Sequence, residues 1–304
     1  PTDMSGNNPD PDMRPNAVNN SWGDCGTAYD GWYQTVVDAW QAAGVYPIFS
    51  NGNSSNCGYT SPPGLNTVGN PARYGNVTGV GSSGEQNGQY ASHSNWGPSD
   101  VADTINPNGG FAYMKPQVIA PGVSIRSSTP GSDTEYQDGW TGTSMSAPHV
   151  TGLVALMWQA GPCLVGDYAT TETLMENTAV PVVYDDGSGD TPTNDPNYAA
   201  GWGEIDAMAA IQAAASICGD STLDGTVTDA VTAEPLAGAK VTIVALADPA
   251  NDRTVYTDAA GYYSASVWAD TSDITAEKFG YAPETVTGVV LARDLRTGQT
   301  SLAC

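Results

Sequence analysis

The chain has 304 residues, which is room for one large domain or two ordinary ones. A hydrophobic fraction of 40%, with eight Trp and fifteen Tyr, is enough for a sizeable core and excludes a globally disordered chain. Nine basic against 33 acidic residues give a net charge of -24, which excludes nucleic acids and anionic membrane surfaces as partners. No apolar run approaches the roughly 18 residues that a membrane-spanning helix needs, so membrane insertion is not expected.

The first part of the chain alternates strand and helix patterns. Residues 17–23 are predicted to form a short strand that runs into a tight turn, and a helix is predicted at 32–43 that ends at Gly44. Residues 45–50 are typical of a buried strand. This strand–helix–strand order predicts a parallel α/β sheet with functional sites at the carboxyl ends of its strands.

Further strands are predicted at 77–81 and 115–123, and residues 54–75 are predicted to be loop. A helix at 146–159 has few polar residues, so we expect it to be largely buried, with Pro148 in a first turn that has no donor to lose. A final Ala-rich helix is predicted at 205–215.

Composition changes after Cys218. Five short β-rich runs separated by turns predict a small all-β sandwich, with Tyr262 in its core; they lie at 226–229, 240–244, 254–257, 262–267 and 274–276. We therefore divide the chain into a domain at 1–217 and a second at 222–304.

The five cysteines of this acidic, Gly-rich chain suggest an oxidising compartment. Cys25 and Cys57 both lie in Gly/Asn/Ser-rich loops and are the favoured disulfide pair. A Cys163–Cys218 pair is plausible, which leaves Cys304 over. None of the spacings is typical of a zinc site.

Residues 142–149, GTSMSAPH, set Ser144 between small residues just before an apolar helix, the setting that a nucleophilic serine needs. This run resembles the nucleophile motif of the subtilisin-like (S8) serine peptidases. Three more segments resemble that family: SNGN at 50–53 the oxyanion-hole turn, NSWG at 20–23 the substrate-binding strand, and VIAPG at 118–122 the strand before the nucleophile loop. Within the family, NNSWG and the β-sandwich tail are most similar to the bacillopeptidase F group.

The resemblance implies that Ser144 attacks the scissile carbonyl and that its N–H and the Asn53 amide bind the oxyanion. Loss of such a donor costs about 10²–10³ in kcat, a magnitude measured on a subtilisin. The resemblance further implies substrate-binding roles, with Gly69 as the floor of the specificity pocket, for Ser21, Trp22, Gly23, Ser50, Asn51, Gly52, Gly69 and Thr143. The alternatives are a helix N-cap for Ser144, a turn residue for Asn53 and a core aromatic for Trp22.

In this family the catalytic Asp and His precede the substrate-binding strand, and this chain begins after both. The expected fold is therefore an N-terminally truncated subtilisin-like domain. His149 belongs to the nucleophile motif and His93 is interpreted as a half-buried loop histidine, so neither is expected to act as the base. A serine without its base loses most of a roughly 10⁶-fold advantage, so we expect this chain to be inactive alone.

The resemblance implies a secreted endopeptidase that acts on proteins or peptides through an acyl-enzyme on Ser144, without a cofactor for the chemistry. The alternative is a pseudopeptidase scaffold with an adhesion or binding β-domain. Residues 222–304 resemble carboxypeptidase regulatory-like (transthyretin-like) domains and contain no catalytic constellation. The acidic segment 183–199 is a candidate structural calcium site, although it lacks EF-hand spacing and a solvated loop is favoured.

Overall fold

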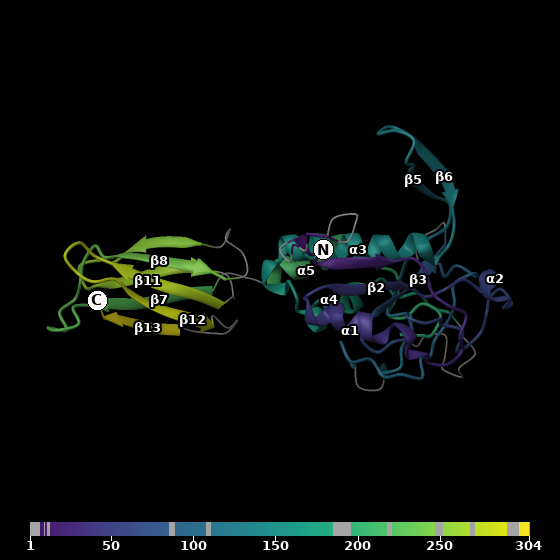
Figure 1. Cartoon of the computed structure of the whole chain (residues 1–304), viewed down its shortest axis with the longest axis horizontal. Helices are drawn as coiled ribbons and strands as arrows, with labels where there is room; N and C mark the ends of the chain where they lie inside the picture. The colour runs from purple at the N-terminus through teal and green to yellow at the C-terminus, as the bar shows by residue number, and fades with distance from the viewer. Residues whose placement is uncertain are drawn as a thin grey trace. The chain divides into compact units, whose positions relative to one another are not determined.

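The structure is a computed structural model that describes residues 7–8, 10, 13–84, 89–107, 111–184, 196–217, 221–246, 252–267, 271–290 and 298–303. The chain divides into two compact units (Figure 1). The first comprises Pro1–Gln159 and Gly166–Ala214, and the second comprises Ala160–Val165 and Ala215–Cys304.

The first unit is built on a parallel four-stranded sheet of order β1-β2-β3-β4. Its strands are β1 (Ala17–Asn20), β2 (Tyr46–Ser50), β3 (Thr78–Ser83) and β4 (Val118–Pro121). All three strand pairs are parallel, and every residue of β2 and β3 is buried. The α/β class with a parallel sheet, predicted from the sequence, is thereby confirmed.

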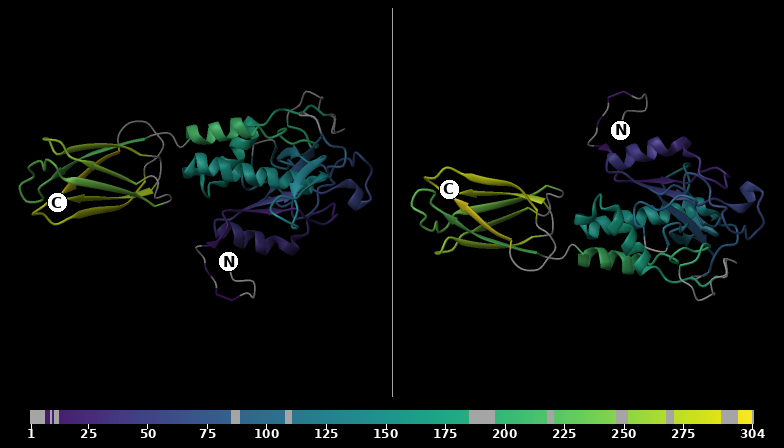
Figure 2. Two further views of the ribbon diagram at one scale, coloured as in Figure 1. Left: turned by 90° about the horizontal axis from the view of Figure 1, so that it is seen from above. Right: turned by 90° about the horizontal axis from the view of Figure 1, so that it is seen from below.

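Helices cover both faces of this sheet, as a parallel sheet requires. Figure 2 shows α3 (Thr143–Ala160) and α5 (Ala207–Ile217) on one face and α1 (Gln34–Ala42) on the other. A 3-10 turn, η2 (Gly31–Tyr33), precedes α1, and η4 (Pro162–Leu164) precedes α4 (Tyr168–Thr178). Three helical elements were not predicted: η4, α4, and the short helix α2 (Ser54–Cys57), which lies in a segment expected to be loop.

Helix α3 differs from its prediction in two ways. It begins at Thr143, three residues earlier than expected, so Pro148 lies in its second turn rather than its first. It is also not buried all round, because Pro148, His149 and Gly152 are exposed and Leu156 is 49% exposed. Val150 and Leu153 face the core instead. The apolar composition of the helix therefore does not mean complete burial.

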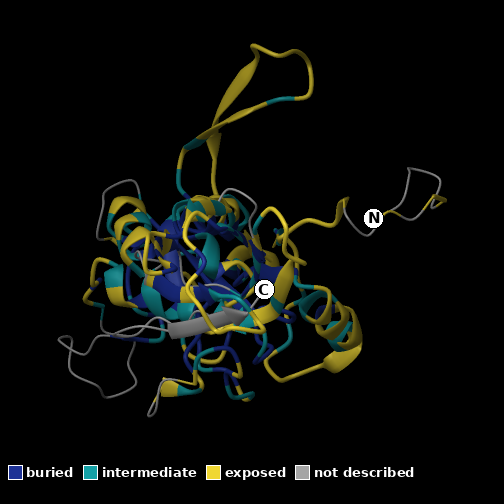
Figure 3. Ribbon diagram, turned by 90° about the vertical axis from the view of Figure 1, so that its left-hand side faces the viewer, coloured by how far each residue is buried: buried dark blue, intermediate teal, exposed yellow. Residues whose placement is uncertain are grey.

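An antiparallel hairpin between β4 and α3 was also not predicted. It pairs β5 (Ile125–Ser128) with β6 (Tyr136–Trp140), and it extends away from the sheet (Figure 1). All five residues of β6 are exposed, as Figure 3 shows. The Arg126 guanidinium lies 5.1 Å from the ring centroid of Tyr136 and 3.7 Å from the Asp138 carboxylate, so polar contacts support this ribbon.

Helix α4 carries a buried carboxyl group to the sheet. Glu172 is fully buried, and its Oε2 accepts hydrogen bonds from Thr78 Oγ1 at 2.5 Å and Tyr46 OH at 3.3 Å. Its Oε1 has no hydrogen-bond partner among the described residues. Burial, with the nearby charges of Asp103 and Glu176, raises the pKa of Glu172 well above its usual range.

The second unit contains two sheets. One, of order β10-β7-β13, holds β7 (Ser221–Thr228), β10 (Tyr262–Val267) and β13 (Gly298–Ala303). The other, of order β12-β11-β8-β9, holds β8 (Lys240–Ala245), β9 (Arg253–Tyr256), β11 (Thr271–Glu277) and β12 (Glu284–Val290). Residues of both sheets share one core, which includes Leu223, Val241 and Ile274. The predicted all-β sandwich is therefore confirmed.

One predicted core residue of this unit is wrong. Tyr262 is 42% exposed, whereas Tyr263 is 1% exposed and belongs to the core. Side chains alternate along β10, so Tyr263, Ala265 and Val267 point inward and Tyr262 points to solvent.

The predicted disulfide between Cys25 and Cys57 is present in the structure. Cys163 is also disulfide-bonded. The predictions for Cys218 and Cys304 fall outside the described residues. In the described part of the chain, no helix combines the length and apolarity needed to cross a bilayer.

Candidate active site

The carboxyl ends of two neighbouring strands place the predicted binding segments side by side. Ser21, Trp22 and Gly23 directly follow β1, and residues 51–53 directly follow β2. Both segments border a cavity of about 160 Å³ that Ser144, from the start of α3, also lines. The lining residues are Ser21, Trp22, Gly23, Asp24, Cys25, Ser50, Asn51, Gly52, Asn53, Asn56, Cys57, Gly69 and Ser144.

Ser144 and Asn53, which lie 91 positions apart in the sequence, thus meet at one cavity. Asn53 is held by the residue before the serine: Thr143 donates to Asn53 Oδ1 from its N–H at 2.9 Å and from its hydroxyl at 3.2 Å. An N–H can only donate, so the atom facing Thr143 is the amide oxygen and the NH₂ group points away from it. Thr143 itself is buried and does not line the cavity; it orients Asn53.

The start of α3 presents Ser144 with an N–H that has no acceptor inside the helix. Ser144 is the second helical residue, and the first four amides of a helix lack intrahelical acceptors. The positive end of the helix dipole also lies there, which favours negative charge. An oxygen anion formed beside Ser144 is therefore stabilised by this end of the helix.

Two hydrogen bonds join Ser144 to the segment after β1. Ser144 Oγ donates to Ser21 O at 3.3 Å, and Ser21 Oγ donates to Ser144 O at 2.7 Å. The Ser144 carbonyl would normally accept from the N–H four residues later, but that residue is Pro148, which has none. Ser21 therefore supplies the donor that the helix lacks at this position.

Glycine is required at several of the predicted site positions. Gly52 and Gly142 have backbone φ angles of 99° and 146°, which residues other than glycine rarely adopt. A Cβ on Gly69 would lie 2.2 Å from the carbonyl oxygen of Asp24. Gly69 lines the cavity, and it also permits the close packing of Asp24 on its backbone, whereas its role as the floor of a specificity pocket stays a prediction.

The remaining predicted residues divide into buried and accessible ones. Ser50 is 6% exposed and Asn51 is fully buried, with its side-chain amide donating to Asn95 O at 2.5 Å. Trp22 is 40% exposed. Its ring packs edge-on against the Phe49 ring, with 5.3 Å between the ring centroids, and Trp22 also lines the cavity. Trp22 is therefore not a core aromatic, and its role as a wall of a substrate subsite stays a prediction.

Sequence reasoning missed four residues that line the cavity: Asp24, Cys25, Asn56 and Cys57. The cysteines were predicted to be paired but not to border the site. Asp24 directly follows Gly23, so its proximity to a predicted binding segment was a signal that could have identified it.

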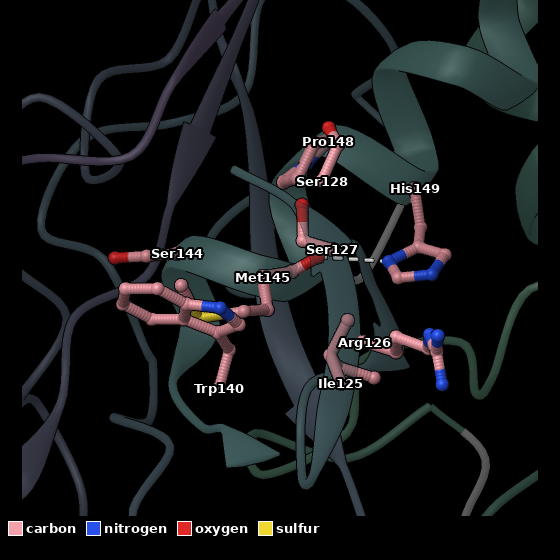
Figure 4. Close-up of a pocket in the computed structure, with 9 residues that line it drawn as sticks. All are labelled: Ile125, Arg126, Ser127, Ser128, Trp140, Ser144, Met145, Pro148 and His149. Carbon is pink, nitrogen blue, oxygen red and sulfur yellow. Dashed lines mark hydrogen bonds between the residues drawn. The ribbon is translucent and has the colours of Figure 1, made fainter. Parts of the chain in front are cut away.

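Ser144 also lines a second cavity, of about 480 Å³ (Figure 4). The hairpin contributes Ile125, Arg126 and Trp140, and α3 contributes Met145 and His149. Figure 4 shows the Ser144 side chain and the His149 ring on opposite sides of the first helical turns. His149 Nδ1 lies 2.8 Å from Met145 O, so that nitrogen carries the proton.

Within the residues that the structure describes, no imidazole is hydrogen-bonded to Ser144 Oγ, whose recorded partner is Ser21 O. His93 is half-buried as predicted, its Nε2 is buried without a partner, and burial lowers its pKa. Among the described residues no group of three or more His, Cys, Asp or Glu side chains is placed to hold a metal. The core of the acidic segment, residues 185–195, lies outside them, so calcium binding there stays a prediction.

Comparison with known proteins adds two family matches and several relatives. The subtilase family matches residues 4–203, and the carboxypeptidase regulatory-like domain matches residues 222–301. Bacillopeptidase F of Bacillus subtilis is 38% identical over 213 residues, 70% of this chain and 13% of that protein. Subtilisin E of the same organism is 34% identical over 146 residues, 48% of this chain and 31% of that protein. This chain thus spans less than a third of the length of either relative.

Among solved structures, fervidolysin from Fervidobacterium pennivorans, described as a keratinolytic enzyme related to subtilisin, matches with a TM-score of 0.45 and 21% identity. The match covers 96% of this chain and 44% of that one.

Proposed function

This chain belongs to the subtilase family of serine peptidases, and on that premise we propose that it carries the nucleophile of a secreted endopeptidase. Its substrates are proteins or peptides, and its intermediate is an acyl-enzyme on Ser144. The observation that carries the proposal is the bond between Thr143 and Asn53 Oδ1, which turns the amide NH₂ of Asn53 away from Thr143 in the cavity that Ser144 lines.

In the proposed reaction Ser144 Oγ attacks the scissile carbonyl carbon and gives its proton to a base. The charge that develops on the carbonyl oxygen is stabilised by the Ser144 N–H and the Asn53 amide. The C–N bond then breaks, and the amine leaves with a proton from the protonated base. Water attacks the resulting ester, which releases the acid and restores the serine.

The two cavities that share Ser144 are assigned to the two sides of a scissile bond. The acyl part of an extended peptide occupies the 160 Å³ cavity beside Asn53. The leaving part occupies the 480 Å³ cavity beneath the hairpin. An engineered cavity of about 150 Å³ takes up benzene, so either cavity has room for at least one side chain.

The described residues supply no base to Ser144, and we expect this chain alone to react slowly or not at all. His149 is bonded through Nδ1 to its own helix, and His93 is half-buried. A base that these residues do not supply is needed for turnover, since its removal costs about 10⁶-fold in a subtilisin. Structural calcium in the acidic segment remains part of the proposal, and no cofactor takes part in the chemistry.

The test is active-site labelling with a fluorophosphonate, followed by peptide mapping. It uses the intact protein, by which we mean this chain together with the segment expected to carry the catalytic Asp and His. We expect one adduct, on Ser144, and none in Ser144→Ala. Ser264→Ala, which removes an exposed hydroxyl from β10 of the second unit, should label as the parent does. An intact protein that is folded but carries no adduct on Ser144 would favour the alternative of a pseudopeptidase scaffold with a binding β-domain.

A further inference from the structure

The cavity beside Asn53 contains one residue with an ionisable side chain. Of the thirteen residues that line it, all of them described, Asp24 alone is charged, because Cys25 and Cys57 are joined as a disulfide. Asp24 is half-buried, so water screens its charge only in part. The other cavity at Ser144 instead contains Arg126, which is paired with Asp138 at 3.7 Å (Figure 4).

The Asp24 carboxylate is fixed in place by neutral donors. Its Oδ1 accepts from Asn70 N at 2.8 Å, Gly26 N at 2.9 Å and Asn70 Nδ2 at 3.2 Å. Its Oδ2 accepts from Asn70 Nδ2 at 3.2 Å. Oδ1 lies 3.6 Å from the point where a Cβ on Gly69 would stand, so the carboxylate lies beside the backbone of Gly69, which lines the same cavity.

No cation offsets this charge among the ion pairs of the described residues. Arg73, whose guanidinium donates to Gly26 O close to the same turn, is paired with Asp100 at 3.0 Å. A carboxylate oxygen can accept more than one hydrogen bond, and Asp24 Oδ2 accepts one, from Asn70 Nδ2 at 3.2 Å. The cavity therefore offers a fixed acceptor with an unneutralised negative charge.

We propose that Asp24 is a specificity-determining residue that selects substrates with Arg or Lys at the position whose carbonyl is attacked. The inference deepens the proposed function and rests on it. A guanidinium or ammonium group that reaches Asp24 forms a hydrogen-bonded ion pair with the carboxylate, which a neutral side chain cannot form. The preference belongs to the acyl side only, because the cavity on the leaving side is lined by Arg126.

The first experiment compares peptides that differ only in this residue, which is arginine or its neutral isostere citrulline. For the intact protein we expect kcat/KM to favour arginine by about 10- to 100-fold, because only the guanidinium places a positive charge opposite the Asp24 carboxylate. Asp24→Asn keeps an oxygen to accept from Gly26 and Asn70 but removes the charge, and should bring the ratio to near one. Asp133→Asn removes a charge from the hairpin instead and should leave the ratio unchanged.

The second experiment does not depend on the serine. Binding of a product peptide that ends in arginine or citrulline is measured by calorimetry on the Ser144→Ala protein, with and without Asp24→Asn. Arginine-selective binding that Asp24→Asn abolishes supports the inference even if Ser144 proves unreactive. A labelled Ser144 together with an arginine-to-citrulline ratio near one, or a ratio that Asp24→Asn does not change, overturns the inference and leaves the proposed function standing.

Discussion

The hydrogen bond from Ser21 to the Ser144 carbonyl predicts a specific energetic coupling with Pro148. Ser21→Ala removes the 2.7 Å bond and leaves that carbonyl without a donor, because Pro148 has no N–H to offer. A lost hydrogen bond costs about 0.5–1.5 kcal/mol, and a buried unpaired carbonyl about 1–3 kcal/mol. Ser144 is half-buried, so we expect the free energy of unfolding to fall by about 1–2 kcal/mol.

Pro148→Ala supplies the matched background. An alanine at this position restores the helical N–H, which can donate to the Ser144 carbonyl in place of the Ser21 hydroxyl. Ser21→Ala should then cost less than about 0.5 kcal/mol, so the double-mutant cycle yields a coupling energy of about 1 kcal/mol. The 3.1 Å bond from Asn19 to Ser21 Oγ is lost in both backgrounds and cancels in the cycle.

The assay is urea denaturation followed by tryptophan fluorescence. Every tryptophan except Trp268 belongs to the first unit, so the signal reports chiefly on the unit that holds the site. Ser127→Ala, an exposed serine of the hairpin, should change stability by less than about 0.5 kcal/mol. Equal costs of Ser21→Ala in both backgrounds, within about 0.3 kcal/mol, would refute the reasoning.

Three other perturbations have defined outcomes. Burial raises the pKa of Glu172 in the folded protein, so its contribution to stability is complete below the ordinary Glu pKa of about 4.3 and is lost as pH rises through the folded pKa. The free energy of unfolding of Glu172→Gln, measured by urea titration at several pH values, should therefore rise relative to that of the parent by up to about 1.4 kcal/mol for each pH unit above the ordinary Glu pKa. A difference in free energy that does not depend on pH would contradict this. Gly69→Ala, with its Cβ 2.2 Å from a backbone oxygen, should lower the melting temperature by the equivalent of about 1–3 kcal/mol, and an unchanged melting temperature would show that the cavity wall at Gly69 can move. Replacing Cys25 and Cys57 together by Ser opens a loop with a sequence separation of 32, for which chain entropy predicts a loss of about 3–4 kcal/mol in calorimetric unfolding; a loss below about 1 kcal/mol would indicate a structured unfolded state.

The elements predicted correctly are those in which a run of apolar residues is buried and ends where the polar residues begin. Strand β2 is an apolar run that stops at a polar turn, and all five of its residues are buried. Helix α4 was missed because its buried positions include Thr171 and Glu172, polar residues that ordinarily indicate a solvent-facing surface. The hairpin was missed because the residues of β6 are all exposed, so its sequence has no alternation of apolar and polar residues.

Errors at single residues have simple geometric causes. Two tyrosines are adjacent at the start of β10, and a shift of one residue exchanges the faces of a strand, so sequence alone could not choose between Tyr262 and Tyr263. The candidate site was predicted as four separate segments, of which three (20–23, 50–53 and 142–149) contribute residues to one cavity; the meeting of the first two depends on the parallel order of β1 and β2. Asp24 was missed because it stands one position beyond the recognised NSWG segment.

The covalent bond between Cys25 and Cys57 joins the segment after β1 to helix α2, two walls of a single cavity. With the bond intact, the opening is fixed before any ligand arrives, and little conformational entropy is lost when one binds. Reduction of this disulfide would remove the covalent link between the two walls and lower the affinity for a peptide without any chemical change at Ser144. Peptide affinity would therefore depend on the redox potential of the surrounding solution.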